Sequence, residues 1–522
     1  MKHPAPVVLA MLLCGGATLC AQAPRIVATL QLPTTHTLTG VLPTDLDGDA
    51  HPDLVLAVRT DATADARTGR ELRFHRGRAL AEHGTLYANE PSRPPLPIDR
   101  DVIAFNCVDC RPSPGRELVL LTQARAVLVT FAENGEPRYE ALAEHRLVWP
   151  AAARDFVLPL PDSRCDFDRD GREDLLLPTP DGALLQSLAD PTRRFELTLP
   201  PRQNPLTKGK NGGASFEDGR FALSLSSGDG QDRRPLVQLR ARTPRPRLLD
   251  LDGDGTLELA ASRNGVCFVA RPMAKDAAVG RRALPLPQDR LSLFDPAYSV
   301  QWGDVDGDRR LDLLLSSSAR RDDEVEVRID LFRTGADGSW PTKPDSRLRV
   351  QPLARPPQLV DADGDGRLDV VVTTVRTDAL RMPGENAPKS LEAQLHVFRG
   401  DGTRFRQPAA LAERLQLPAG GDRGTLLRVL PGRAGEPGRV LLCVDDALVL
   451  RPLLRDGERL RLGEPTGALP LPAKARFSAH GTSSQPGDDD ADDDDSADDG
   501  VDEGVGDLLV RTAHELLVVR LP

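Results

Sequence analysis

The stretch that decides the fold is DADGDGRLDVVVTT, residues 361–374. Acidic side chains stand at Asp361, Asp363, Asp365 and Asp369, and an apolar, β-branched run follows at once. Four carboxylates within nine residues repel one another, so a folded chain has to neutralise them. The β-branched run predicts a strand. The stretch therefore predicts an acidic turn that leads directly into a β-strand.

The same pattern occurs four more times along the chain. The copies are DLDGDAHPDLVLA from residue 45, DFDRDGREDLLLP from 166, DLDGDGTLELAAS from 250 and DVDGDRRLDLLLS from 304. Each has acids at relative positions 1, 3, 5 and 9 and runs into an apolar segment. Three weaker copies, from residues 109, 432 and about 499, keep only parts of the pattern. Together they divide the chain into eight units of 54 to 84 residues, the signature of a repeat architecture.

Each unit has turn signals that separate short antiparallel strands. Asp-Gly or Asn-Gly turns separate β-type runs in TFAENGEPRY, DLFRTGADGSW, HVFRGDGTRF and PLLRDGERLRL, whereas helical periodicity is absent. Four strands per unit, repeated radially, predict an all-β β-propeller of about eight blades, or seven if one weak unit is not a blade. RIVATLQLP precedes the first unit and HELLVVRLP ends the chain one strand short. We therefore expect the N-terminal strand to complete the last blade.

The acidic turns predict calcium sites. Oxygen ligands at alternating positions, with glycine at position 4 or 6, suit Ca²⁺, and the EF-hand loop opens with the same spacing. Magnesium requires a stricter octahedron, and the absence of His and Cys side chains as ligands disfavours zinc and copper. About five structural ions are expected, each bound by four acids and the backbone carbonyl at position 7. The predicted ligands are Asp45, Asp47, Asp49, His51 and Asp53; Asp166, Asp168, Asp170, Arg172 and Asp174; Asp250, Asp252, Asp254, Thr256 and Glu258; Asp304, Asp306, Asp308, Arg310 and Asp312; and Asp361, Asp363, Asp365, Arg367 and Asp369.

The repeated D-x-D-x-D-G-x-x-D-L pattern resembles the FG-GAP/VCBS repeat of integrin α-subunit propellers and many exported bacterial proteins. The resemblance covers essentially the whole chain after its N-terminal segment. The Phe-Gly and Gly-Ala-Pro signatures of the integrin branch are absent, so the bacterial VCBS-type branch is closer. The resemblance implies a calcium-stabilised propeller that serves as a binding or adhesion scaffold. It assigns no ligand, because one fold hosts many functions.

Residues 1–23 are predicted to be a secretory signal peptide. Lys2 precedes an apolar run over residues 7–13, and Ala21 and Ala23 offer two alternative cleavage sites. Residues 24–522 are then one propeller domain. No later segment has about 18 uninterrupted apolar residues, so no membrane span is expected. The protein should be exported, either secreted or held in the periplasm or at the cell surface.

The net charge of -11 comes mostly from one acidic run. Ten Asp and one Glu lie within residues 487–503, and the rest of the chain is near neutral, which argues against a nucleic-acid surface. A disordered acidic loop is predicted at about 485–504. Asp490, Asp492, Asp494 and Asp498 also match the 1-3-5-9 spacing, but no strand follows directly, so they predict only a weaker sixth site.

Five cysteines follow the signal segment, and this odd, sparse set is no disulfide framework. The CxxC pair of Cys107 and Cys110 predicts a local disulfide or simple packing rather than redox chemistry, because no helix start follows it.

Motifs for catalysis are sparse. HExxH, GxSxG and P-loop patterns are absent, and three Trp and three Tyr give little material for glycan stacking. Arg399-Gly400-Asp401 matches the tripeptide that integrins recognise, but its place in the unit predicts a hairpin turn. The sequence thus favours a non-catalytic scaffold for an unidentified extracytoplasmic protein or glycan. The alternative is a calcium-dependent polysaccharide lyase, since some lyases resemble such propellers.

Overall fold

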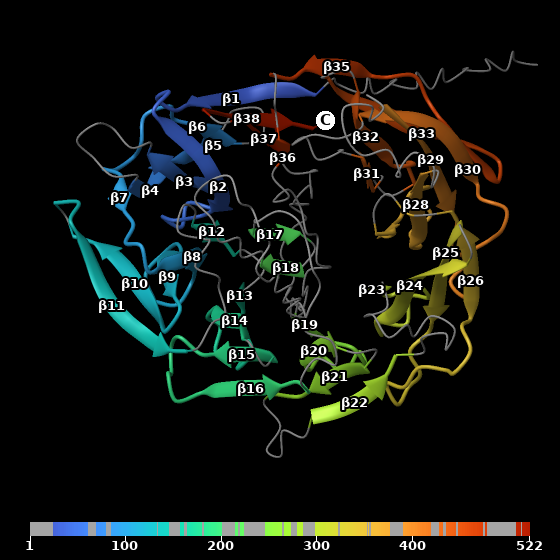
Figure 1. Cartoon of the computed structure of the whole chain (residues 1–522), viewed down its shortest axis with the longest axis horizontal. Coiled ribbons are helices and arrows are strands. Elements are labelled where there is room, and N and C mark those ends of the chain that lie inside the picture. Colours follow the sequence, from blue (N-terminus) through green and yellow to red (C-terminus); the bar gives the residue numbers. More distant parts are fainter. Residues whose placement is uncertain are drawn as a thin grey trace, which may run out of the picture.

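Eight antiparallel sheets stand around a central axis in the computed structural model of the chain (Figure 1). The structure describes residues 24–60, 69–79, 85–132, 134–145, 157–160, 164–179, 182–200, 214–217, 220–223, 246–263, 266–272, 279–284, 298–321, 324–351, 353, 356–375, 390–418, 427–431, 435–444, 447–472, 476–477, 508–512 and 514–521. These residues contain strands and no helix. The eight-bladed all-β propeller predicted from the repeats is therefore confirmed, and the seven-blade alternative is wrong.

The first four blades follow the chain in order. Blade 1 has β2 (His36–Thr44), β3 (Asp53–Thr60), β4 (Gly69–His75) and β7 (Leu96–Pro97). Blade 2 has β8 (Val102–Val108), β9 (Glu117–Thr122), β10 (Arg125–Phe131) and β11 (Pro137–Glu144), with β12 (Leu158–Pro159) parallel to β8. Blade 3 has β13 (Arg164–Cys165), β14 (Asp174–Thr179), β15 (Gly182–Gln186) and β16 (Arg194–Thr198). Blade 4 has β19 (Arg247–Leu249), β20 (Glu258–Arg263), β21 (Val266–Ala270) and β22 (Val279–Ala283).

The remaining blades continue around the ring. Blade 5 has β23 (Tyr298–Gly303), β24 (Asp312–Arg321), β25 (Glu324–Phe332) and β26 (Ser346–Val350). Blade 6 has β27 (Gln358–Val360), β28 (Asp369–Val375), β29 (Ser390–Phe398) and β30 (Leu411–Pro418). Blade 7 has β31 (Leu427–Leu430), β32 (Arg439–Val444), β33 (Ala447–Asp456) and β34 (Arg459–Leu462), with β35 (Gly467–Pro470) also on β33. Blade 8 has β36 (Arg476–Phe477), β37 (Leu508–Arg511), β38 (Glu515–Arg520) and β1 (Arg25–Gln31).

The two ends of the chain close the ring within blade 8. Strand β1 pairs antiparallel with β38, from Arg25 opposite Arg520 to Gln31 opposite Glu515. Leu32 then donates its backbone N–H to the carbonyl of His514 (2.7 Å). The first strand of each blade lies nearest the centre and the fourth at the rim, so β1 takes the rim position of blade 8 (Figure 1). The prediction that the N-terminal strand completes the last blade is confirmed.

Apolar packing joins each blade to the next. The buried residues form eight clusters, and each cluster draws its members from two adjacent blades. Strand β38 shows the cause, since Leu516 and Val518 pack toward blade 1 while Leu517 and Val519 pack toward blade 7. Successive side chains of a strand point to opposite faces of its sheet, so a blade between two neighbours needs both faces apolar. This explains the continuous apolar runs that follow each acidic turn.

Two short hairpins lie outside the blades. Strands β5 (Gly77–Ala79) and β6 (Thr85–Tyr87) form one, and β17 (Ala214–Glu217) and β18 (Arg220–Leu223) form the other. The sequence also predicts a surface loop over the insertion NPLTKGKNGGASFEDG, residues 204–219. Strand β17 lies within this stretch and pairs with β18, which begins directly after it. The signal segment and the acidic run lie outside the described residues, and both stay predictions. In the described part, no helix could cross a membrane.

Candidate metal centres

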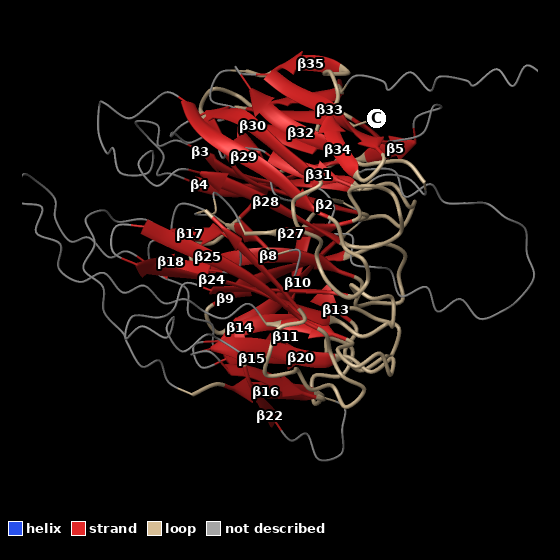
Figure 2. Ribbon diagram, turned by 90° about the vertical axis from the view of Figure 1, so that its right-hand side faces the viewer, coloured by secondary structure: helices blue, strands red, loops and turns tan. Residues whose placement is uncertain are grey.

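All five acidic loops occupy the same place in their blades. Each connects the first strand to the second, so all five lie at one end of the sheets, on a single face of the ring. Figure 2 shows the described loops gathered along one face. The loops also bond to the loop of the next blade, because Arg116 donates its backbone N–H to the carbonyl of Asp45 (2.9 Å) and Gly438 donates to Ala362 (2.9 Å). The loops therefore form neighbouring, connected positions rather than isolated turns.

The backbone of every loop turns twice through left-handed conformations. Positions 4 and 6 have positive φ in all five loops, between 55° and 81°. Glycine adopts this conformation without strain, and it occupies most of these positions. The three non-glycine residues with positive φ in the described part, Ala50, Arg169 and Arg309, are all at these positions. The sequence predicts a tight turn with glycine at position 4 or 6, and the structure shows a left-handed backbone at both positions.

The acids at positions 1 and 5 hold this turn by accepting backbone hydrogen bonds. Asp361 accepts N–H bonds from Gly364 and Gly366 (both 2.8 Å). In every loop the position-1 acid accepts the N–H of position 6. The position-5 acid accepts the N–H of position 7, as Asp365 does from Arg367 (3.0 Å). These bonds bend the backbone around the acids and draw their carboxylates together.

The acid at position 9 begins the second strand and is buried. Asp369 accepts the N–H of Ala362 through Oδ2 (3.1 Å) and that of Gly400, just after the third strand, through Oδ1 (2.8 Å). Asp53, Asp174 and Asp312 make the same pair of backbone bonds in their blades. Glu258 differs, because Pro272 follows Arg271 and has no N–H, and the Arg271 Nε donates instead (2.8 Å). Position 9 therefore joins its loop to the third strand.

Burial makes the charge at position 9 costly. Desolvation raises the pKa of Asp369 and that of Asp174 to about 7, and the pKa of Asp312 to about 6, despite opposing backbone hydrogen bonds. Burial likewise raises the pKa of Asp53 and of Glu258. A cation beside these carboxylates would favour their charged form.

The acid at position 3 has the clearest feature of a ligand. One of its oxygens is buried without a partner in four of the five loops: Asp47 Oδ1, Asp168 Oδ1, Asp252 Oδ1 and Asp306 Oδ1. In the fifth loop, Asp363 Oδ2 contacts Arg399 Nε instead. Buried polar atoms in native proteins are almost always satisfied, so the same exception four times requires a common cause. A metal ion bound in each of these four loops would supply the missing partner.

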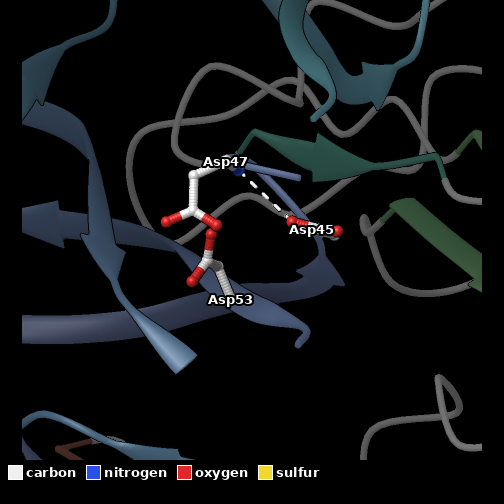
Figure 3. A group of neighbouring side chains, drawn as sticks. All are labelled: Asp45, Asp47 and Asp53. Carbon is white, nitrogen blue, oxygen red and sulfur yellow. Dashed lines mark hydrogen bonds between the residues drawn. The ribbon is translucent and has the colours of Figure 1, made fainter. Parts of the chain in front are cut away.

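The carboxylate oxygens also lie at a spacing that suits one ion. One oxygen from each of three acids lies within 4.8 Å of the others in every loop. Two oxygens that each bind Ca²⁺ at about 2.4 Å lie no more than about 4.8 Å apart. The groups are Asp45, Asp47 and Asp53; Asp166, Asp168 and Asp170; Asp250, Asp252 and Asp254; Asp304, Asp306 and Asp308; and Asp361, Asp363 and Asp365. In the first group, Asp47 and Asp53 turn carboxylate oxygens toward each other (Figure 3).

The full predicted ligand sets are gathered only in part. Position 9 joins its group in the first loop alone, and Asp49, at position 5 of that loop, does not belong to the group. Two parts of the predicted ligand sets stay predictions: bidentate binding by the acid at position 9, and binding by the backbone carbonyl at position 7. The residues at position 7 are His51, Arg172, Thr256, Arg310 and Arg367. Asp490, Asp492, Asp494 and Asp498 lie outside the described residues.

Two motifs singled out in the sequence have structural roles. Cys107 and Cys110 are free, buried thiols rather than a disulfide, and burial raises the pKa of each to about 12, so both pack in the core. Arg399-Gly400-Asp401 forms the predicted turn, bridged from Gly400 to Phe405. Its residues bind within the chain, since Arg399 contacts Asp365 (3.1 Å) and Asp401 accepts bonds from Thr403 and Arg404.

The sequence reading missed a group of arginines beside the loops. Arg76, Arg271, Arg333 and Arg399 immediately follow the third strand of their blades, and each contacts the position-3 acid of its own loop. The sequence does show a pattern that could have predicted them, because arginine recurs directly after the third strand, as in DLFRTG and HVFRGD.

Comparisons with known proteins add no assignment. No known protein family matches the sequence, and no curated protein is similar enough to match. Among solved structures, BBS1N in complex with ARL6DN is 12% identical, with coverage of 96% of this chain and 98% of the other and a TM-score of 0.32. The V. cholerae biofilm matrix protein Bap1 is 11% identical, with coverage of 96% and 91% and a TM-score of 0.33. The exotype rhamnogalacturonan lyase YesX is 17% identical, with coverage of 54% and 48% and a TM-score of 0.22.

Proposed function

We propose that this chain is an exported, calcium-stabilised β-propeller of the FG-GAP/VCBS kind that acts as a non-catalytic binding scaffold. The observation that supports it is the position-3 oxygen left buried without a partner in four of five loops of the same design. All-oxygen acidic ligands in a flexible turn favour calcium over magnesium or zinc. Each ion would neutralise a group of acids that otherwise repel, and would thereby stabilise its blade. The role is structural because the sites recur blade after blade rather than converging on one place.

Calcium should raise the melting temperature of the protein. A ligand that binds only the native state adds about 2.7 kcal/mol per site at a hundredfold excess over its Kd. With five sites, a chelator should lower the melting temperature by roughly 10 °C in a chain of this size. The measurement is a thermal melt in calcium, in magnesium and in chelator. A melt that does not change between calcium and chelator would contradict the metal assignment.

A variant with one disabled loop gives the matched comparison. Replacement of Asp361, Asp363 and Asp365 by asparagine removes three like charges but retains most of the turn's acceptors. The triple variant should bind one calcium equivalent fewer than the wild type in equilibrium dialysis, while the other four loops keep theirs. If the triple variant binds as many calcium ions as the wild type, this loop is not a calcium site.

The scaffold role predicts a partner outside the cytoplasm. We expect a pull-down from envelope and secreted extracts to retain a discrete protein or glycan in calcium and to lose it in chelator, because the ions would fix the conformation of the five acidic loops on one face of the ring. The triple variant serves as the control, and it should lose part of the binding.

The alternative is a calcium-dependent polysaccharide lyase. It predicts that unsaturated products are released from a panel of polysaccharides, measured as a rise in absorbance at 235 nm. Such release would overturn the non-catalytic role.

A further inference from the structure

An arginine lies against the position-3 acid in each of the five acidic loops. The pairs are Arg76 with Asp47, Arg193 with Asp168, Arg271 with Asp252, Arg333 with Asp306, and Arg399 with Asp363. In blades 1, 3, 4 and 5 the arginine contacts Oδ2, and the oxygen without a hydrogen-bond partner is Oδ1. In these four blades the arginine therefore neutralises one side of the acid that the proposed ion would use from the other side, whereas Arg399 contacts Oδ2 of Asp363.

The pairing does not follow simply from a shared sequence position. In blade 3 the partner is Arg193, which lies beyond the end of β15 at Gln186, and still its Nη1 reaches Asp168 Oδ2 (3.2 Å). In blade 2, position 3 is Arg111 rather than an acid, and Ala132 follows the third strand where blades 1, 4, 5 and 6 have arginine. Blade 2 thus lacks both the acid and the arginine. In the five acidic loops, the contact with the acid ties the role of the arginine to the charge of the loop.

Blade 4 shows this role most fully. The Arg271 guanidinium contacts Asp252, Asp254 (3.0 Å) and Glu258 (2.8 Å), which are positions 3, 5 and 9 of one loop. In blade 6, Arg399 contacts both Asp363 and Asp365, and Arg455 of blade 7 lies 4.0 Å from Asp363. Asp363 is fully buried, so these guanidinium groups supply most of the positive charge near it. An arginine cannot lose its proton in a protein, so this positive charge is permanent.

We propose that Arg76, Arg193, Arg271, Arg333 and Arg399 act as built-in counter-cations, which hold each acidic loop together without metal and weaken its affinity for calcium. This inference rests on the proposed calcium sites. The two effects have one cause, because a fixed positive charge attracts the carboxylates and repels an incoming divalent ion. The arginine is a positioning residue, since it touches the acids rather than the ion. The resulting weak sites would suit an environment in which calcium is abundant and would leave the metal-free ring folded.

The test replaces Arg271 with glutamine and with lysine. Two readouts are needed: the melting temperature in chelator, and the calcium concentration that displaces half of the terbium bound at the loops. Trp302 and Trp340 belong to the same apolar cluster as Leu251 and Leu313. Energy transfer from these tryptophans to bound terbium therefore reports on the loops of blades 4 and 5.

Arg271→Gln should lower the melting temperature in chelator by a few degrees. It should also make calcium bind roughly tenfold more tightly, since a repulsive unit charge is lost. Arg271→Lys, which keeps the charge, should stay near the wild type in both readouts.

Arg414→Gln is the matched control, because Arg414 is 78% exposed on β30 and contacts Glu392 at the rim, far from the acidic loops in its blade. It should change neither readout. A purely structural arginine would lower stability and affinity together in Arg271→Gln, and that result would overturn the inference, as would no change in affinity. If the wild type bound neither terbium nor calcium, both the proposed function and this inference would be wrong. If the wild type bound calcium and Arg271→Gln bound it no more tightly, only the inference would fall.

Discussion

Asp369→Ala should lower the free energy of unfolding by about 3–5 kcal/mol, in chelator as well as in calcium. The side chain is fully buried and accepts two backbone hydrogen bonds, from Ala362 in its own loop and from Gly400 after the third strand. Alanine would leave both buried N–H donors unpaired, and each such donor costs about 1–3 kcal/mol. These bonds lie within the chain, so the loss does not require metal. Urea unfolding in both conditions is the measurement.

Two further variants separate the hydrogen-bonding role of Asp369 from a role as a metal ligand. Asp369→Asn keeps one acceptor oxygen but points an NH₂ group at a backbone donor, so its loss should be intermediate. Glu458→Gln changes a carboxylate that is 88% exposed, and its effect should stay within about 0.5 kcal/mol. If Asp369→Ala is destabilising in calcium but neutral in chelator, the residue is a ligand alone and its two hydrogen bonds contribute nothing to stability.

The repeat made most of the fold predictable from the sequence. Acids at positions 1, 3, 5 and 9 mark where the first strand ends and the second begins, because the turn and the buried strand leave separate signatures. The blade number stayed open because the unit from residue 109 keeps only its first and last acids and the unit from residue 432 has no ligand set. The structure shows what replaces them. Glu117 still accepts the N–H of Cys110 (3.1 Å), as the position-9 acids do, and Gly438 donates to the neighbouring loop at Ala362.

The candidate sites were predictable as loops but not as complete charge arrangements. Spacing along the chain brings Asp361, Asp363 and Asp365 together because one turn holds all three. The contact of Arg271 with Asp252 depends instead on the register between β20 and β21, which a single sequence does not specify. Arg193 reaches its acid from yet another offset. Positive φ at Ala50, Arg169 and Arg309 was also hidden, because their side chains disfavour the conformation that the loop imposes.

Removal of residues 24–33, which contain β1, should cost about 5 kcal/mol or more and make copies of the chain associate through the exposed edge. The segment buries Leu30 and Leu32 against Leu516 and Val518, and it covers the outer edge of β38 along its length. Without it, that edge presents unpaired backbone groups beside exposed leucine and valine, which favours pairing with another copy. The measurements are a thermal melt and the molar mass from light scattering after size exclusion.

A synthetic peptide with the sequence of residues 24–33 tests whether strand pairing itself is responsible. The peptide should bind the truncated chain, restore most of the melting temperature and return the molar mass to that of the full chain, because it can add the missing strand to β38. The same peptide with Leu30→Asp keeps the backbone but loses the buried side chain, and it should restore little. A truncated chain that melts as the full chain does and shows no added association would show that the ring closes without β1. In that case the pairing of Arg25 through Gln31 with β38 would be an accessory contact rather than the closure of the propeller.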